Sequence, residues 1–332
     1  MKTKYFGAFD YFRIIAAALV IFIHAPAVPF LGDTGNLLLS GTFARIAVPF
    51  FFAVTGFFTD FSSADAIKKL VKKTALMYIA ATAVYLPYGS YFASIKQILF
   101  DGTFYHLWYF PAAAMGAVIV FWLKKLPTVP AVVIASLLYT FGLCGDSYRV
   151  LAKNIEPLSK TLDVLSNVFS FTRNGLFFAP MFLLLGSVLG EKTCFALAEK
   201  SSPIGVFIAI PCFVMSLAML ISERLLLKEI TFSPNDNMFI SLVPCTIFLL
   251  LILSAIRLKP RPILRQISMW IYIVHPIIID LINRITNGFD ETTGMLGEDA
   301  LRVIFSASIS LAIAAVFGIL FSVKKAKNAR IA

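Results

Sequence analysis

Long apolar segments at regular intervals constrain the fold of this chain more than any other feature of its sequence. The hydrocarbon core of a bilayer is about 30 Å thick, so one helix needs roughly 20 apolar residues to cross it. The candidate spans are residues 12–30, 43–59, 74–90, 106–123, 129–145, 174–190, 203–221, 238–256, 267–283 and 302–323. We therefore predict an all-α, polytopic membrane protein with about ten transmembrane helices.

Two parts of this pattern are weaker. The third span runs into Pro87 and Gly89, and residues 146–172 form a connection long enough to carry a surface helix. Self-similarity at a period of 20 to 50 residues and low-complexity segments are not apparent in the sequence. The prediction is a single membrane domain over residues 1–332.

The charge of the chain supports this interpretation. Hydrophobic residues make up 59% of the chain and charged residues 14%, which excludes an ordinary soluble domain. The net charge of +11 is distributed between apolar runs, unlike the basic face of a nucleic-acid-binding fold, so no nucleic-acid partner is predicted. With a cytoplasmic N-terminus, 18 of the 29 Lys and Arg residues lie inside, eight lie outside and three lie at span ends. We predict cytoplasmic N- and C-termini in the cell membrane.

Three ionisable residues, Asp10, Arg13 and His24, lie in or beside the first span. Asp10 and Arg13 are three positions apart and close enough to pair on a helix. Arg13 and His24 lie on the same face of the helix, about 16 Å apart along its axis. This arrangement is what the polar lining of a tunnel would need. His24 then suits general-base work on a hydroxyl or amine, and no metal is predicted. The alternative is an interfacial ion pair, with His24 bonded to a neighbouring helix.

Further polar residues favour a tunnel. His275 precedes Pro276 inside the ninth span, where it either lines the interior or ties a proline kink. His106, Trp108 and Tyr109 open the fourth span, as substrate contacts or as an interfacial aromatic belt.

Arg45 and Arg173 lie at outer span ends without an acidic neighbour in sequence. They could hold a carboxylate or phosphate, or extend to lipid headgroups.

Four lysines precede the third span at i, i+1, i+4 and i+5: Lys68, Lys69, Lys72 and Lys73. They either mark the cytoplasmic side of the membrane or form a cradle for a phosphate-rich donor such as an acyl-CoA.

Together these motifs resemble acyltransferase family 3, a family of multispan membrane proteins. The resemblance rests on their order along nearly the whole chain: Asp10, Arg13, His24, residues 45–52 before Thr55-Gly56, the lysines, and residues 272–276. Residues 105–111, 145–147 and 172–178 further resemble the membrane domain of the serine racemases of vancomycin resistance. In that subgroup the membrane domain is thought to supply L-serine to a pyridoxal-phosphate racemase domain, which makes D-serine for peptidoglycan precursors. We expect no racemase domain within these 332 residues, so pyridoxal phosphate would belong to a cytoplasmic partner.

Three functions remain open on the sequence. A supply module would admit L-serine through Arg45 or Arg173 and past His24. An enzyme would bind acyl-CoA at Arg13 and the lysines and use His24 to deprotonate a small hydroxyl acceptor. A passive membrane anchor would need none of these residues. Acyl-CoA would be the donor in the enzyme hypothesis, and no other cofactor is predicted for these residues.

Overall fold

The computed structural model of the chain describes residues 6–25, 31–88, 94–198, 204–230 and 236–287, together with 308, 309 and 312. The chain divides into two compact units, residues 1–48 with 252–332 (unit 1) and residues 49–251 (unit 2). In the described ranges every regular element is a helix, and the extended backbone forms one isolated bridge between Phe6 and Leu258. The predicted all-α class is therefore confirmed.

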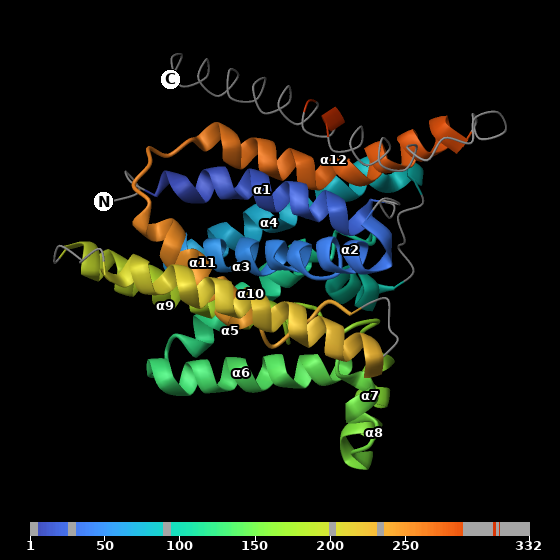
Figure 1. Cartoon of the computed structure of the whole chain (residues 1–332), viewed down its shortest axis with the longest axis horizontal. Coiled ribbons are helices and arrows are strands. Elements are labelled where there is room, and N and C mark those ends of the chain that lie inside the picture. The colour runs from blue at the N-terminus through green and yellow to red at the C-terminus, as the bar shows by residue number, and fades with distance from the viewer. Residues whose placement is uncertain are drawn as a thin grey trace. The chain divides into compact units, whose positions relative to one another are not determined.

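Unit 1 is built on two long helices that lie side by side (Figure 1). Its elements are α1 (Gly7–His24), α2 (Gly32–Leu39), the 3-10 helix η2 (Phe43–Ile46) and α12 (Pro262–Asn287). The Gly7 amide donates to the Leu258 carbonyl at 2.9 Å, so α1 and α12 start together and run parallel. A Cβ on Gly7 would lie 2.2 Å from the Lys259 carbonyl oxygen, so this approach requires glycine.

Unit 2 holds the remaining helices, and contacts fix the relative directions of α5, α6 and α9. They are α3 (Ala47–Phe58, in this unit from Pro49), α4 (Ala64–Tyr85), η3 (Leu86–Tyr88), the π-helical turn η4 (Gln97–Asp101), α5 (Tyr109–Leu123), α6 (Thr128–Gly145), α7 (Arg149–Ala152), α8 (Glu156–Ser166), α9 (Ala179–Ala198), α10 (Ile204–Ile230) and α11 (Leu242–Ala255, in this unit to Leu251). Phe141 meets Phe177, just before α9, whereas the earlier Tyr139 meets the later Phe182, so α6 and α9 are antiparallel. Lys124 pairs with Glu191 at 2.8 Å where α5 and α9 run parallel.

Glycines allow α3 and α9 to pack backbone against backbone. A Cβ on Gly186 would lie 1.9 Å from the Ala53 carbonyl oxygen, and one on Gly190 would lie 2.6 Å from the Phe57 carbonyl oxygen. A Cβ on Gly56 of α3 would likewise lie 2.0 Å from the Leu183 carbonyl oxygen. Small residues four apart are the usual means of close helix contact in membranes.

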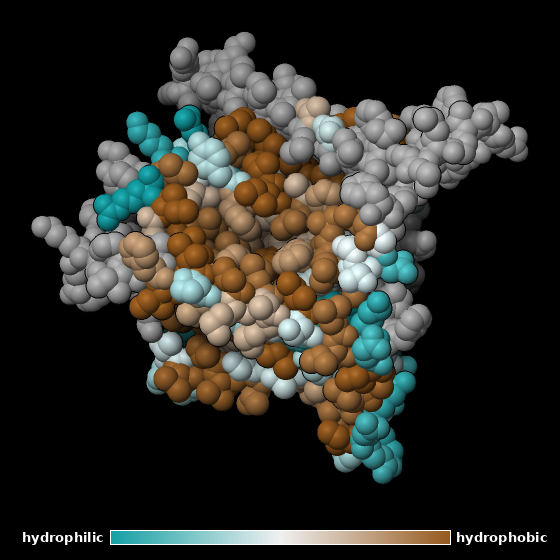
Figure 2. All heavy atoms as spheres, viewed as in Figure 1, coloured by the Kyte–Doolittle hydropathy of each residue, from teal (hydrophilic) through white to brown (hydrophobic). Residues whose placement is uncertain are grey.

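Among the residues that the structure describes, five segments are long and apolar enough to cross a membrane: Gly7–His24, Gly32–Phe58, Thr128–Gly145, Phe207–Ile230 and Pro262–Ile282. Shorter apolar helices cover Tyr109–Leu123, Ala179–Glu191 and Leu242–Ala255. Apolar side chains cover the outer faces of α6 and α10, including Val129, Leu137 and Phe207, whereas polar side chains gather on α8 (Figure 2). These faces suit contact with lipid.

The third and fourth predicted spans, 74–90 and 106–123, need correction at their boundaries. The helix in the first region, α4, begins at Ala64 because the Ser63 hydroxyl accepts the Ala66 amide and caps it, and it ends at Tyr85, before Pro87. The fourth predicted span was expected to begin at His106, but α5 begins at Tyr109.

One further region differs from the prediction, and another lies outside the residues that the structure describes. The connection at residues 146–172 contains two helices, α7 and α8, in place of one. The tenth predicted span, 302–323, lies outside the described residues except at 308, 309 and 312.

Candidate functional site

A buried carboxylate joins the two long helices of unit 1. Asp10 is fully buried, and its Oδ1 accepts from Arg13 Nη1 at 3.1 Å and from Arg265 Nε at 2.6 Å. Its Oδ2 accepts from Arg265 Nη2 at 3.1 Å and from the Arg261 amide at 2.8 Å. The Asp10–Arg13 pair predicted from spacing is confirmed, and two guanidinium groups on one carboxylate leave a net positive charge.

The two histidines of unit 1 lie next to each other further along the same pair of helices. The ring centroids of His24 and His275 are 5.4 Å apart. His275 is fully buried, and its Nδ1 lies 2.9 Å from the Tyr272 carbonyl oxygen and 3.1 Å from that of Ile271. Because both neighbours are acceptors, Nδ1 carries the proton and Nε2 keeps a lone pair. Pro276 lacks the amide that the Tyr272 carbonyl would otherwise accept, and the histidine replaces it.

Arg13 and His24 therefore belong to one stripe of α1 that faces α12. The sequence separation places them about 16 Å apart along the helix axis, with the Asp10 carboxylate beside one and His275 beside the other. Arg45 lies in η2, which packs against α1 in the same unit.

A second group of candidate residues comes together in unit 2. The Arg173 guanidinium carbon lies 4.4 Å from the Phe171 ring centroid and 5.4 Å from that of Trp108. Tyr109 stacks on Phe52, with ring centroids 4.6 Å apart. The Arg173 guanidinium is thus held by cation–π contacts with two aromatic rings.

His106 lies in the same region, buried in an aromatic cluster. Its ring centroid is 4.9 Å from Tyr85, 5.4 Å from Tyr105 and 5.7 Å from Phe104. The first turns of α4 carry the four exposed lysines, Lys68, Lys69, Lys72 and Lys73, whereas Tyr85 is the last residue of this helix. The structure therefore places the lysines at the far end of α4 from His106.

Asp146 is a site residue that sequence reasoning did not select. Its Oδ1 accepts from the amides of Asn237 at 2.7 Å and Met238 at 2.9 Å, and from the Ser147 hydroxyl at 2.9 Å. Burial raises the pKa of this carboxyl, while these hydrogen bonds and the charge of Arg173 oppose that rise. The position of an acid in a Gly-Asp-Ser turn after an apolar run was a usable signal.

A network on α10 continues from Asp146. Glu223 accepts from the Tyr148 hydroxyl at 2.5 Å and from the amides of Ile240 and Ser241 at 2.6 and 2.8 Å. Burial and the bond to Glu223 raise the pKa of Tyr148. Arg224 pairs with Asp236 at 2.7 Å, and both are buried. These bonds fix the segment before α11 against the ends of α6 and α10.

Most of the sequence-predicted residues thus form two groups, each within one unit, and the four lysines of α4 belong to neither group. Unit 1 brings Asp10, Arg13, His24 and His275 onto the α1–α12 pair, and unit 2 brings Arg173 against Trp108. The arrangement in unit 1 offers two adjacent imidazole rings. The arrangement in unit 2 offers a guanidinium with a buried carboxylate near it. In the described residues, no three His, Cys, Asp or Glu side chains are grouped as metal ligands.

Comparison with known proteins shows similarity along the whole chain. The model of the acyltransferase domain of acyltransferase family 3 matches residues 6–323. An amino-acid racemase of Enterococcus faecalis is 33% identical over 99% of this chain and 47% of its own length. A serine/alanine racemase of Enterococcus gallinarum is 31% identical over 84% of this chain and 41% of its own length. The chain spans less than half of these relatives. No solved structure matches it.

Proposed function

Because this chain belongs to acyltransferase family 3 and is a multi-pass membrane protein, we propose that it is the membrane module of an amino-acid racemase system. In this proposal it takes up or supplies L-serine for D-serine production, as in vancomycin resistance, where D-serine enters modified peptidoglycan precursors. The support from comparison is that racemases match nearly the entire chain. The structural observation that carries it is Arg173, whose guanidinium lies over the rings of Phe171 and Trp108 near a buried acid.

Serine is a zwitterion, so its site needs opposite charges at short range. Arg173 would bind the carboxylate through its planar fork. Asp146 is the nearby acid and lowers the cost of holding the guanidinium in an aromatic setting. Arg45 is the second candidate carboxylate ligand. His24 would lie on the path through the interior.

The proposed topology has about ten spans and both termini in the cytoplasm. Helices that cross a membrane in alternate directions must be parallel when their span numbers are both odd or both even. The parallel pairs α1–α12, α5–α9 and α3–α9 obey this rule for the predicted span numbers, and antiparallel α6–α9 does as well. This order puts Asp146 and Arg173 outside and the four lysines inside.

A racemase domain or partner in the cytoplasm would complete the system. Racemisation and pyridoxal phosphate are assigned to that partner. Residues 1–332 then act as one membrane domain, and the cytoplasmic C-terminus of the proposed topology would place such a partner on the correct side.

The second candidate function is acyl transfer, which the His24–His275 pair favours. One imidazole would remove the proton from an acceptor hydroxyl as its oxygen attacks the thioester carbon of an acyl-CoA. The carbon–sulfur bond then breaks, and the thiolate leaves and takes up a proton as free CoA. Arg13 in unit 1 and the four lysines in unit 2 would each be a candidate ligand for the donor's phosphates. His275, whose Nε2 keeps a lone pair, is placed to orient His24 or to share its proton.

One assay separates these functions. Purified protein in liposomes is tested for uptake of labelled L-serine and for release of CoA from acetyl-CoA. Serine supply predicts uptake that falls at least about tenfold in Arg173→Gln and no CoA release. Acyl transfer predicts CoA release that is lost in His24→Ala.

Lys160→Gln serves as the control, because this lysine is exposed on α8 and its ion pair within the described residues is with Glu156, which is also exposed. It should leave both activities unchanged. Absence of both activities in the wild-type protein would leave the anchor function.

A further inference from the structure

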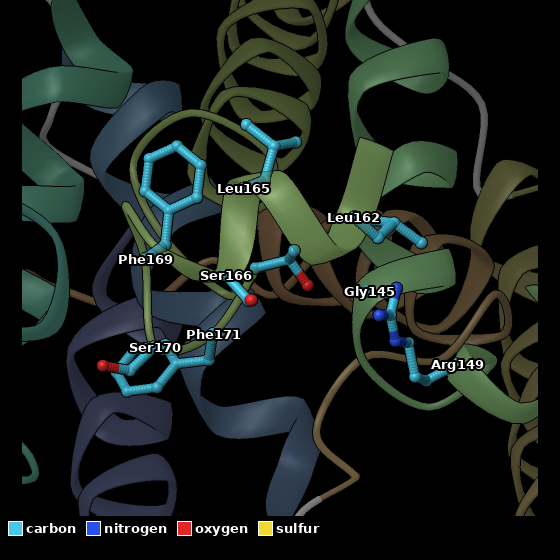
Figure 3. Close-up of a pocket in the computed structure, with 9 residues that line it drawn as sticks. Gly145, Arg149, Leu162, Leu165, Ser166, Phe169, Ser170 and Phe171 are labelled. Atoms are coloured by element: carbon cyan, nitrogen blue, oxygen red, sulfur yellow. The ribbon is translucent and has the colours of Figure 1, made fainter. Parts of the chain in front are cut away.

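A cavity of about 220 Å³ lies in unit 2 under α8. Its walls include Arg149 of α7, Leu162, Leu165 and Ser166 of α8, and Phe169 and Phe171 of the following loop (Figure 3). At about 30 Å³ per molecule it has room for roughly seven waters. It is too small for a drug-sized ligand, which needs about 300 Å³ or more, but a small solute fits.

The loop wall of the cavity is fixed in place by η4. Asp101 accepts from the Ser170 amide at 3.0 Å and from the Ser170 hydroxyl at 2.6 Å. Phe100 packs against Phe169 with ring centroids 4.7 Å apart. Because these contacts come from a separate element, the cavity is a formed feature of the unit and not a gap beside a loose loop.

Arg149 is the one charged residue among those that line the cavity. Its Nη2 bonds to Asp163, which lies on the exposed side of α8. Its Nη1 is buried and has no hydrogen-bond partner in the part of the chain that the structure describes. A buried N–H of a cation without an acceptor is costly, so the cavity is suited to an anionic oxygen at this position.

The hydroxyl groups of the lining offer the complementary chemistry. Ser166 donates its proton to the Asp163 carbonyl oxygen at 2.6 Å, and Thr172 donates to that of Gly142 at the same distance. Ser170 donates to Asp101. With their protons committed, these oxygens keep acceptor lone pairs for a ligand. Leu162, Leu165 and Phe169 supply apolar surface for a short carbon chain.

We propose that this cavity is a binding site for a small carboxylic acid that also carries an amino or hydroxyl donor. Arg149 Nη1 binds the carboxylate, the Ser and Thr oxygens accept from the amino or hydroxyl group, and the leucines contact the carbon atoms. The ligand class is thus a short α-amino or α-hydroxy acid.

This site is separate from the one formed by Arg173. Arg149 lines the cavity and Arg173 does not. Phe171 borders both sites, because it lines the cavity and its ring lies 4.4 Å from the Arg173 guanidinium carbon. The inference rests on the cavity and does not depend on the proposed serine supply. A ligand can occupy it whether or not the chain transports one.

The test is equilibrium binding to the full chain in lipid nanodiscs. L-serine and L-lactate are titrated by calorimetry, with ethanolamine and 1-propanol as probes that lack the carboxylate. The two acids should bind and the two other probes should not. Arg149→Gln, which keeps most of the side-chain length but removes the charge, should weaken acid binding at least about tenfold.

Leu165→Trp fills the cavity and should also abolish this binding, which keeps the test valid if Arg149→Gln is unstable. Lys160→Gln on the exposed face of α8 should bind as the wild-type does. Arg173→Gln should change this affinity less than about threefold. Binding that survives both Arg149→Gln and Leu165→Trp, or that is lost in Arg173→Gln alone, would overturn the inference and leave the proposed supply function standing.

Discussion

The Asp10 carboxylate bonds to two arginine side chains and one backbone amide from two helices. Breaking a buried ion pair from one side costs about 3 to 5 kcal/mol, because the remaining charge is left without compensation. We expect Asp10→Asn, which preserves shape, to lower stability by about 3 kcal/mol. The measurement is the midpoint of thermal unfolding in detergent micelles.

A matched pair of arginine variants tests the bonds of Asp10 to Arg13, Arg265 and the Arg261 amide, which we call the clamp. Arg265 donates to Asp10 through its side chain, whereas Arg261 donates only its backbone amide in the bonds that define the clamp. Arg265→Gln should therefore destabilise the protein clearly, and Arg261→Gln should change its stability by less than about 0.5 kcal/mol. Equal losses in the two variants would contradict this assignment.

Asp146 gives the fold a dependence on pH. Its pKa in the folded protein is raised by burial, so between the ordinary aspartate pKa and this raised value the folded chain holds a proton that the unfolded chain releases. Its contribution to stability consequently falls as pH rises through that window. Asp146→Asn keeps an acceptor oxygen for Asn237 and Met238 without ionising. Unfolding midpoints are measured across the acidic pH range. The fall in stability with rising pH that Asp146 causes should be absent in the variant.

At the scale of elements, the α3–α9 contact depends on the absence of side chains. Even a methyl group on Gly186 would overlap the Ala53 carbonyl oxygen, and the two helix backbones would have to separate. Gly186→Ala should lower the unfolding midpoint by the several degrees that correspond to about 1 to 3 kcal/mol of overpacking. Leu137→Ala on the exposed face of α6 is the control and should cost less. Equal effects would show that the two helices adjust freely.

Most helices could be predicted from the sequence, because apolar length and helix geometry are local properties. The boundaries of α4 could not be predicted from hydropathy alone. Its first turns carry Lys68 to Lys73, and its start is set by the Ser63 cap. Hydropathy also could not resolve the two helices of the connection at 146–172. α7 has four residues and α8 is strongly amphipathic, so neither contains a long apolar run.

In the candidate site, too, the contacts between residues close in sequence could be predicted and the long-range contacts could not. Asp10 and Arg13 lie three residues apart in sequence, so their contact could be predicted, but Arg265 follows Asp10 by 255 residues and no local pattern links them. Likewise His24 and His275 were each predicted to be polar and interior, and only the packing of α1 on α12 shows that they are neighbours. Long-range pairing is set by tertiary packing, which a single sequence does not reveal.

For the whole molecule, the proposed topology predicts the side of each loop. A reporter that is active only in the periplasm or extracellular space should be active when fused after Asn154 and inactive when fused after Leu126. Fusions at Ala332 should be inactive. The physical reason is the excess of Lys and Arg on the side assigned to the cytoplasm. Activity at Leu126 would reverse the orientation, and activity at Ala332 would change the number of spans to an odd one.

The clamp between α1 and α12 also orders the biogenesis of the protein. Asp10 emerges from the ribosome 255 residues before Arg265, an interval of roughly ten seconds or more at about 5–20 residues per second. During that time the first helix holds an acid and an arginine whose final partner has not been made. Its definitive docking therefore comes late in synthesis, and a nascent chain interrupted before α12 retains a helix whose Asp10–Arg13 pair lacks the bonds from Arg261 and Arg265. Quality-control proteases can recognise such an exposed polar helix.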